Sequence, residues 1–200
     1  MQLATAYSAM LNGGVLVRPR VVHAINGVEQ PITTRGLATS GRVSSQIIEM
    51  TKGLTRIVPL YTRLASIPSY ASGGKSGTAQ IWLTKEKNGG TAGWDKRHFN
   101  FTYVGWIGQT APEYVVAVSI RRGTPIVNMP GNFLNNIESF ELFRRIAEEI
   151  ASLFNIPPAV PATGSGSASP AHRRAPEPSA LVGLLVGGDP LRRQFVLRRT

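Results

Sequence analysis

The sequence predicts an α+β fold in which helices cover an antiparallel sheet, and three observations predict it. Residues 114–120 (YVVAVSI) are rich in β-branched side chains and are bounded by turn residues, as in a buried strand. Residues 99–107 alternate in apolar character, and residues 108–113 are short enough to join the two strands as an antiparallel hairpin. Residues 137–154 carry one apolar stripe at helical spacing, which suits a helix that covers a face of the sheet.

The N-terminal part supplies further elements. Residues 2–12 have apolar positions three and four apart and end at Asn12-Gly13-Gly14, which predicts a helix and its stop. A strand is predicted over residues 15–22. A second helix is predicted over about 44–58, with Ser44 or Ser45 as its N-cap.

The middle of the chain is expected to be mostly extended. Residues 71–83 enter through small side chains and predict a strand. Residues 85–96 are polar and contain glycine, which predicts a loop.

The composition changes near residue 160. Residues 161–200 are rich in Pro, Gly, Ala, Ser and Arg and contain one aromatic residue, Phe195. This bias is typical of a linker, so we expect residues 1–160 to form the folded part and 161–200 to be a disordered tail. An alternative is that the tail is the translation of an out-of-frame, GC-rich region.

Charge and composition exclude several classes of protein. The 200 residues have a formal net charge of +11, three His and no Cys, so disulfides, thiolate zinc sites and cysteine nucleophiles are excluded. The His residues stand far apart, so no metal site or cofactor is expected. The sequence has no apolar run long enough to cross a bilayer. The basic residues are scattered, which argues against a nucleic-acid face on the folded part and leaves nucleic-acid binding by the tail open.

The segment at residues 73–80, GGKSGTAQ, carries the chemistry. On an extended chain Lys75 and Gly77 face one side, and Ser76 and Thr78 face the other. Hydroxyls and backbone N–H groups beside an ammonium suit an anionic ligand, above all a carboxylate. The segment is not a phosphate loop, because Ser69 stands where that motif requires its first glycine.

KSGT resembles the third signature of the penicillin-binding proteins and serine β-lactamases, and GKSGTAQ resembles its form in class B penicillin-binding transpeptidases. The resemblance continues in residues 2–20 before the signature, and in the hairpin of residues 101–120 and the helix 137–154 after it. It covers roughly residues 1–157. It implies the fold of that family and, for the intact parent, a peptidoglycan D,D-transpeptidase that works through a serine acyl-enzyme and binds penicillin.

The resemblance also implies roles for four residues. Lys75 would hydrogen-bond the hydroxyl of the family's S-x-N motif and add positive charge to the cleft. Ser76 and Thr78 would hold the carboxylate of the substrate or β-lactam, and the N–H of Thr78 would be one of two oxyanion-hole donors. Gly77 would keep the strand open to the acyl group.

Two signatures of the family are missing from the sequence. S-x-N does not occur, and the one S-x-x-K, at Ser72–Lys75, shares its lysine with KSGT and contains two glycines. An extended Ser72 would lack the helical geometry in which lysine activates serine. We therefore expect an incomplete transpeptidase domain, with its nucleophile outside these residues, that is inactive alone.

The resemblance implies partners and a location for the intact parent. The partners would be D-Ala-D-Ala stem peptides, β-lactams and membrane-bound cell-wall polymerases, and the location would be the extracytoplasmic face of the bacterial membrane. No nucleic acid is expected as a partner of the folded part. Two alternatives stay open at this point, namely a non-catalytic β-lactam sensor domain and a basic nucleic-acid-binding module.

Overall fold

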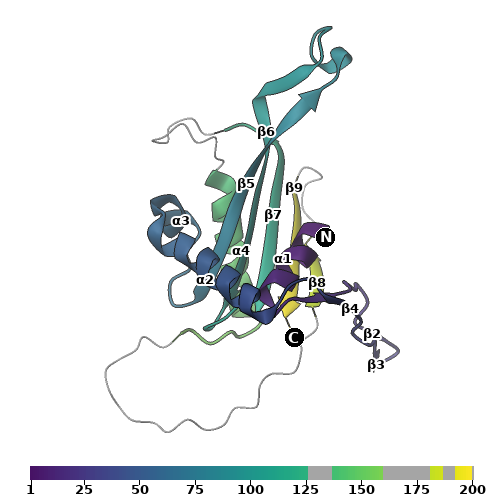
Figure 1. Ribbon diagram of the computed structural model, residues 1–200, viewed down its shortest axis with the longest axis vertical. Helices are drawn as coiled ribbons and strands as arrows, with labels where there is room; N and C mark the ends of the chain where they lie inside the picture. The colour runs from purple at the N-terminus through teal and green to yellow at the C-terminus, as the bar shows by residue number, and fades with distance from the viewer. Residues whose placement is uncertain (126–136, 160–180, 187–191, 200) are drawn as a thin grey trace.

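A computed structural model describes residues 1–125, 137–159, 181–186 and 192–199. Its centre is a five-stranded antiparallel sheet in the order β5-β6-β7-β9-β8 (Figure 1). Its strands are β5 (Ala71–Leu83), β6 (Gly93–Gly108), β7 (Tyr114–Gly123), β8 (Leu181–Val186) and β9 (Arg192–Arg199). This architecture confirms the predicted α+β fold.

The remaining elements surround the sheet or extend from it (Figure 1). The helices are α1 (Gln2–Leu11), α2 (Gly41–Ile57), α3 (Pro59–Leu64), α4 (Ile137–Leu153) and the 3₁₀ turn η1 (Lys85–Lys87). Two small antiparallel pairs are formed by β1 (Val15–Val17) with β4 (Thr34–Leu37) and by β2 (Ala24–Ile25) with β3 (Val28–Glu29).

Alternation along β6 divides the core between the two faces of the sheet. On one face Tyr103 is fully buried, with its ring 4.9 Å from that of Phe140 and 4.7 Å from that of Phe143 on α4. On the other face Val104 and Trp106 pack with side chains of α1 and α2. Each fully buried large apolar side chain contributes roughly 1.5–3 kcal/mol, so both faces need their helical cover. The predictions that helices 2–12 and 137–154 cover the sheet are confirmed.

The N-cap predicted for the second helix is wrong. α2 begins at Gly41, and its N-cap is Ser40, whose hydroxyl accepts a hydrogen bond from the N–H of Val43. Ser44 is buried inside the helix, where its Oγ accepts the N–H of Gly13 at 3.0 Å. The hydroxyl predicted to cap α2 therefore anchors the turn after α1. The short helix α3, which begins with Pro59, was not predicted.

Two other boundaries differ from the sequence predictions. The strand predicted over residues 15–22 ends at Val17, two residues before Pro19, which has no N–H for a ladder. The loop predicted over 85–96 contains η1, and β6 already begins at Gly93. β5 and β6 therefore pair far beyond the KSGT segment.

The tail differs most from its prediction. Disorder was expected over residues 161–200, yet residues 181–186 and 192–199 form β8 and β9, and β9 pairs with β7 from Tyr114↔Arg198 to Ile120↔Arg192. The tail is rich in small residues overall, yet it contains two stretches that form strands. Without β9, the backbone edge of β7 would be unpaired. Residues 161–180 and 187–191 lie outside the described residues, and the domain boundary at 160 stays a prediction.

Candidate carboxylate-binding site on strand β5

The KSGT segment lies on β5, which is an edge strand of the sheet. The two glycines before the motif are needed for packing. A Cβ on Gly73 would come within 2.8 Å of the backbone of α2 at Thr51 and Lys52, and one on Gly74 would come within 2.7 Å of the Tyr103 ring. The glycines let the strand approach α2 on one face and Tyr103 on the other. The position of the motif is therefore set by close contacts with the core.

Tyr61 of α3 organises the first half of the motif. Its phenolic oxygen accepts the backbone N–H of Ser76 at 3.1 Å and is hydrogen-bonded to Ser76 Oγ at 2.7 Å. Lys75 Nζ donates to the same oxygen at 3.4 Å and to the carbonyl of Ser76 at 2.7 Å. Both acceptors of the lysine are uncharged, so neither neutralises its ammonium. Lys75 and Ser76, which alternate in direction along the strand, are thus brought together at Tyr61.

The backbone hydrogen bonds show which groups face away from β6. The N–H and C=O of Ser76 bond to Tyr61 and Lys75, and the C=O of Ser72 accepts the hydroxyl of Thr55 at 3.1 Å. The C=O of Gly77 instead accepts the hydroxyl of Thr102, a β6 residue, at 3.4 Å. Because backbone groups alternate in direction along an antiparallel strand, the N–H of Thr78 faces the outer edge, as that of Ser76 does.

The second half of the motif is solvent-accessible. Gly77 and Thr78 are exposed, and Thr78 pairs in register with Phe101. A Cβ on Gly77 would lie only 2.7 Å from Thr102 Oγ1. The close contact with β6 therefore requires glycine here, in addition to the predicted need to keep the strand open to a ligand. The edge from Ser76 to Thr78 therefore carries two hydroxyls and the outward N–H of Thr78 next to an ammonium, and this combination suits a carboxylate.

Ser72 occupies a different environment from that of an activated serine. It is buried in the extended part of β5, only 6% exposed, and its backbone carbonyl is bonded to α2. Its geometry is that of a strand residue, as the sequence predicts. Lys75, three residues further on, lies on the exposed part of the strand and bonds to Tyr61 and Ser76.

Sequence reasoning missed Tyr61. It stands 15 residues before Ser76 in a segment for which no helix was predicted. A tyrosine in a short apolar stretch gives no signal of a contact with the motif, because only the docking of α3 beside the edge of β5 creates it. A second tyrosine near the motif, Tyr103, packs against Gly74. Its burial raises the pKa of its hydroxyl well above the usual value, so the side chain is neutral.

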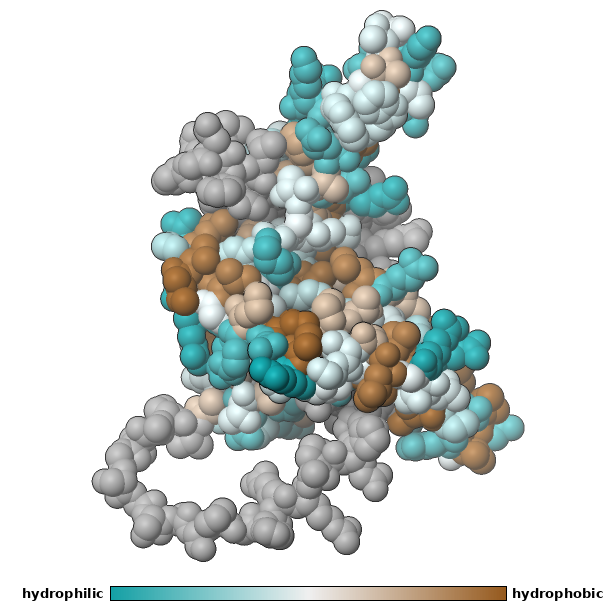
Figure 2. All heavy atoms as spheres, viewed as in Figure 1, coloured by the Kyte–Doolittle hydropathy of each residue, from teal (hydrophilic) through white to brown (hydrophobic). Residues whose placement is uncertain are grey.

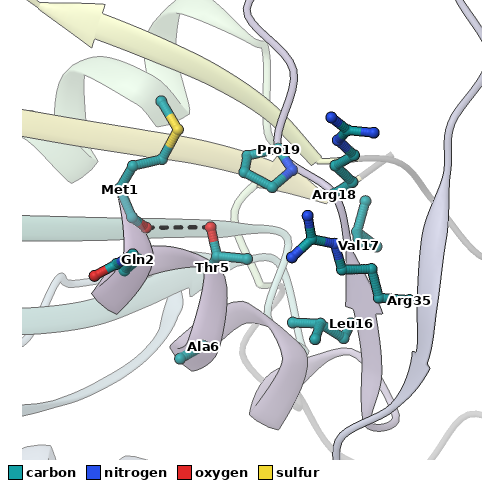
Figure 3. A pocket seen from close by; sticks show the side chains of 9 residues that line it. All are labelled: Met1, Gln2, Thr5, Ala6, Leu16, Val17, Arg18, Pro19 and Arg35. Carbon is teal, nitrogen blue, oxygen red and sulfur yellow. Dashed lines mark hydrogen bonds between the residues drawn. The ribbon is translucent and has the colours of Figure 1, made fainter.

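A cavity of about 340 Å³ lies elsewhere, between α1, β1 and β4. Figure 3 shows the side chain of Arg35 extending into it, with Met1 and Thr5 on the opposite wall. None of its lining residues belongs to β5, so it is separate from the KSGT edge. In the described part of the chain, no group of three His, Asp or Glu residues is placed to hold a metal, and no helix is long and apolar enough to span a membrane.

Comparisons with known proteins identify the family and the fold. The model of the penicillin binding protein transpeptidase domain matches residues 1–146. A peptidoglycan glycosyltransferase from Burkholderia ambifaria is 25% identical, with a TM-score of 0.57 over 80% of this chain and 42% of its own. PBPA from Mycobacterium tuberculosis, at 19% identity, shares the fold with a TM-score of 0.54 over 74% of this chain and 31% of its own.

The chain thus spans less than half the length of these solved structures. The match extends over the KSGT strand, the β6–β7 hairpin and most of α4. Neither the nucleic-acid-binding module nor the sensor domain is favoured by these findings. The chain belongs to the penicillin-binding protein transpeptidase family.

Proposed function

We propose that this chain supplies the carboxylate-binding strand and one oxyanion-hole donor of a serine D,D-transpeptidase. The enzyme would cross-link peptidoglycan stem peptides that end in D-Ala-D-Ala, and β-lactams would acylate it. The observation that carries the proposal is the outer edge of β5, where Tyr61 holds Lys75 and Ser76 beside the exposed Thr78. A chain of this family with that edge is equipped to bind a peptide carboxylate.

The proposed mechanism uses four groups on β5. The ammonium of Lys75 attracts the terminal carboxylate, and the hydroxyls of Ser76 and Thr78 donate hydrogen bonds to it. The outward N–H of Thr78 stabilises the oxyanion that forms at the penultimate D-Ala carbonyl, an effect commonly worth about 10²–10³ in rate. The rest of the stem peptide extends along β5 as an added antiparallel strand.

The nucleophile and the second oxyanion donor lie outside these 200 residues in this proposal. Ser72 does not qualify, because it is buried in a strand and bonded through its carbonyl to α2. The family supports a class B enzyme at the extracytoplasmic face of the membrane, with membrane-bound cell-wall polymerases as partners. The imipenem acyl-enzyme structure of Mycobacterium tuberculosis penicillin-binding protein A, which shares the fold, supports β-lactams as ligands.

Binding of a peptide carboxylate tests the proposal directly. Titration of the chain with N-acetyl-L-Lys-D-Ala-D-Ala should shift the backbone amide NMR signals of residues 76–78. Lys75→Ala should weaken binding about tenfold, since a hydrogen bond to a charged group is worth roughly 1.5 kcal/mol. Lys85→Ala, which removes an exposed lysine further along the chain, is the matched control and should bind like the parent. The absence of shifts at residues 76–78, or equal binding by Lys75→Ala, would overturn the proposed site.

A second experiment tests the placement of the nucleophile. Incubation of the chain with a fluorescent penicillin should leave no label after denaturation. Covalent labelling that Ser72→Ala removes would show instead that the nucleophile is within the chain.

A further inference from the structure

The hairpin formed by the outer ends of β5 and β6 projects beyond the rest of the sheet (Figure 1). The pairing of β6 with β7 ends at Phe99↔Gly123, whereas its pairing with β5 continues to Leu83↔Gly93. Residues 81–98, here called the arm, therefore have no third strand beside them among the described residues. A two-stranded ribbon of this kind has little stability of its own. Other contacts must therefore hold the arm in place.

Asp95 holds the base of the arm. The register shifts from Gln80↔Phe99 to Trp82↔Trp94, so the additional residues lie on β6. The carboxylate of Asp95 accepts the backbone N–H groups of Arg97 and His98 at 2.9 and 3.1 Å, and it contacts His98 Nδ1 at 3.0 Å and Arg122 at 3.3 Å. A buried acid with four polar contacts to three residues thus organises this bulge and ties the arm to β7.

The arm displays two tryptophans. Trp82 and Trp94 are directly opposite each other, with ring centroids 5.0 Å apart at an angle of 83°, and they are 55% and 52% exposed. Cross-strand aromatic pairs stabilise a hairpin, which accounts for the pairing. Stabilisation of the hairpin does not explain why both rings remain largely exposed to solvent. Their exposed surface is available to a ligand with an apolar face.

The end of the arm argues against lipid as that ligand. Residues 84–93 (TKEKNGGTAG) form the end of the hairpin beyond the two tryptophans, and they contain no large apolar side chain. Figure 2 shows the arm as pale and teal, in contrast to the brown apolar patches lower on the same face. A polar tip cannot insert into a bilayer at low cost, whereas it does not hinder binding along the side of the arm.

The position of Trp82 relative to the motif indicates what the ligand is. Trp82 lies four residues beyond Thr78 on the same strand, about 13 Å away at ~3.3 Å per residue. Thr78, Gln80 and Trp82 are every second residue of β5, so their side chains lie on the same face of the strand. All three are exposed. A peptide bound antiparallel to β5 with its carboxylate at Thr78 has its N-terminus toward Trp82, and about four extended residues cover this distance. The N-terminus of a stem peptide is attached to a sugar of the glycan strand.

We propose that Trp82 and Trp94 form a binding surface for the glycan strand that bears the stem peptide. Sugar rings present apolar C–H faces, and the negative face of an indole attracts C–H groups as it attracts other ring edges. The inference that the ligand is a glycan strand rests on the proposed function, because the binding of the carboxylate at Thr78 directs the peptide toward the arm. The surface would select peptides still attached to glycan.

Glycan binding can be measured without any peptide. The probe is a set of glycan strands freed of stem peptides by an amidase, with chitotetraose as a defined oligosaccharide, added to the full chain. The three tryptophans give three indole N–H signals in NMR spectra, and the buried Trp106 serves as an internal reference. The signals of Trp82 and Trp94 should shift, while that of Trp106 should stay constant.

Variants separate stacking from charge and from folding. Trp82→Ala should weaken glycan binding about tenfold, which corresponds to ~1.4 kcal/mol, and Trp82→Phe should retain part of the affinity. The double variant Lys85→Ala/Lys87→Ala, which changes the arm without touching its rings, should bind within about twofold of the parent. An unchanged Trp106 signal in Trp82→Ala shows that the sheet is intact.

Several results would overturn the glycan surface. They are constant Trp82 and Trp94 signals at saturating glycan, equal binding by Trp82→Ala, and binding of the arm to anionic phospholipid vesicles in place of glycan. Failure of the proposed function is distinguishable, because it appears as loss of the peptide response at residues 76–78 while glycan binding persists. Conversely, peptide binding that depends on Lys75 together with no response to glycan would overturn only the role of the arm.

Discussion

The two halves of β5 are built for different purposes. From Ser72 to Gly74 the strand is buried, and its glycines allow α2 and Tyr103 to approach the backbone closely. From Lys75 to Trp82 it is exposed except at Ser76 and Ile81, which are half-buried. The comparison shows how an edge strand can present binding groups accurately, because the half that carries no chemistry is held tightly enough to position the half that does.

Gly73→Ala should have the largest effect, because it acts on the buried half. The new Cβ would lie 2.8 Å from the helix backbone at Thr51 and Lys52, which cannot move aside as a flexible side chain can. Overpacking of a core typically costs 1–3 kcal/mol, and we expect a loss of about 3 kcal/mol in the free energy of unfolding, measured by urea denaturation. The control is Gly53→Ala in α2, where a Cβ meets nothing within 4 Å. It should be neutral or stabilising by up to about 1 kcal/mol. Equal stability of Gly73→Ala and the parent would show that the buried half is not held by this contact.

Thr51→Val should have the next largest effect, because Thr51 also holds the sheet against α2. Its hydroxyl accepts the indole N–H of the fully buried Trp106 at 2.9 Å. Valine keeps the shape but leaves that N–H unsatisfied, which costs about 1–3 kcal/mol. Ser45→Ala, which removes a hydroxyl bonded to a carbonyl on the exposed side of α2, is the control and should change stability by less than about 0.5 kcal/mol. Unchanged stability of Thr51→Val would contradict the prediction.

The β6–β7 hairpin and helix α4 were predictable from the sequence, and the reasons are local. The β-branched run of β7, the alternation in β6 and the apolar stripe of α4 each follow from side-chain periodicity within one element. The KSGT segment was recognisable because its residues are contiguous. The confirmed parts of the fold are therefore those in which neighbouring residues in the sequence determine the structure.

The missed features depend on residues far apart in the sequence. Tyr61 bonds to Ser76 only because α3 docks beside β5, and the base of the arm requires Asp95 and Arg122 to meet across two strands. The capping role predicted for Ser44 was wrong because its hydroxyl is used by Gly13. Strand β9 forms where the backbone edge of β7 supplies hydrogen-bond partners, which composition does not reveal.

Tyr61→Phe tests the junction between the two halves. It removes the oxygen that bonds to the N–H and Oγ of Ser76 and to Lys75, so Ser76 and Lys75 lose a shared anchor. We expect about 1 kcal/mol of destabilisation and about fivefold weaker binding of N-acetyl-L-Lys-D-Ala-D-Ala, followed by NMR titration.

Tyr70→Phe is a matched control for that experiment. Its hydroxyl donates to the carbonyl of Ile156 at 3.2 Å, away from the motif. It should lose a similar amount of stability and keep the affinity of the parent. If both variants bind the peptide alike, Tyr61 serves stability alone and does not position the motif.

The smallest effect is expected at the base of the arm, where acid should loosen the exposed half of β5 and leave the buried half folded. The backbone N–H of Arg97, together with hydrogen bonds and charge from His98, lowers the pKa of Asp95 below its usual value. A carboxyl group whose pKa is lowered by folding stabilises the structure fully above its unfolded pKa of about 3.9, and that contribution is lost as the pH falls through its folded pKa. The near-UV circular dichroism of the Trp82–Trp94 pair should therefore weaken as the pH falls below about 4. Asp95→Asn should show a weak signal at every pH with no such transition, whereas a parent signal that persists until the sheet itself unfolds would show that Asp95 does not hold the arm.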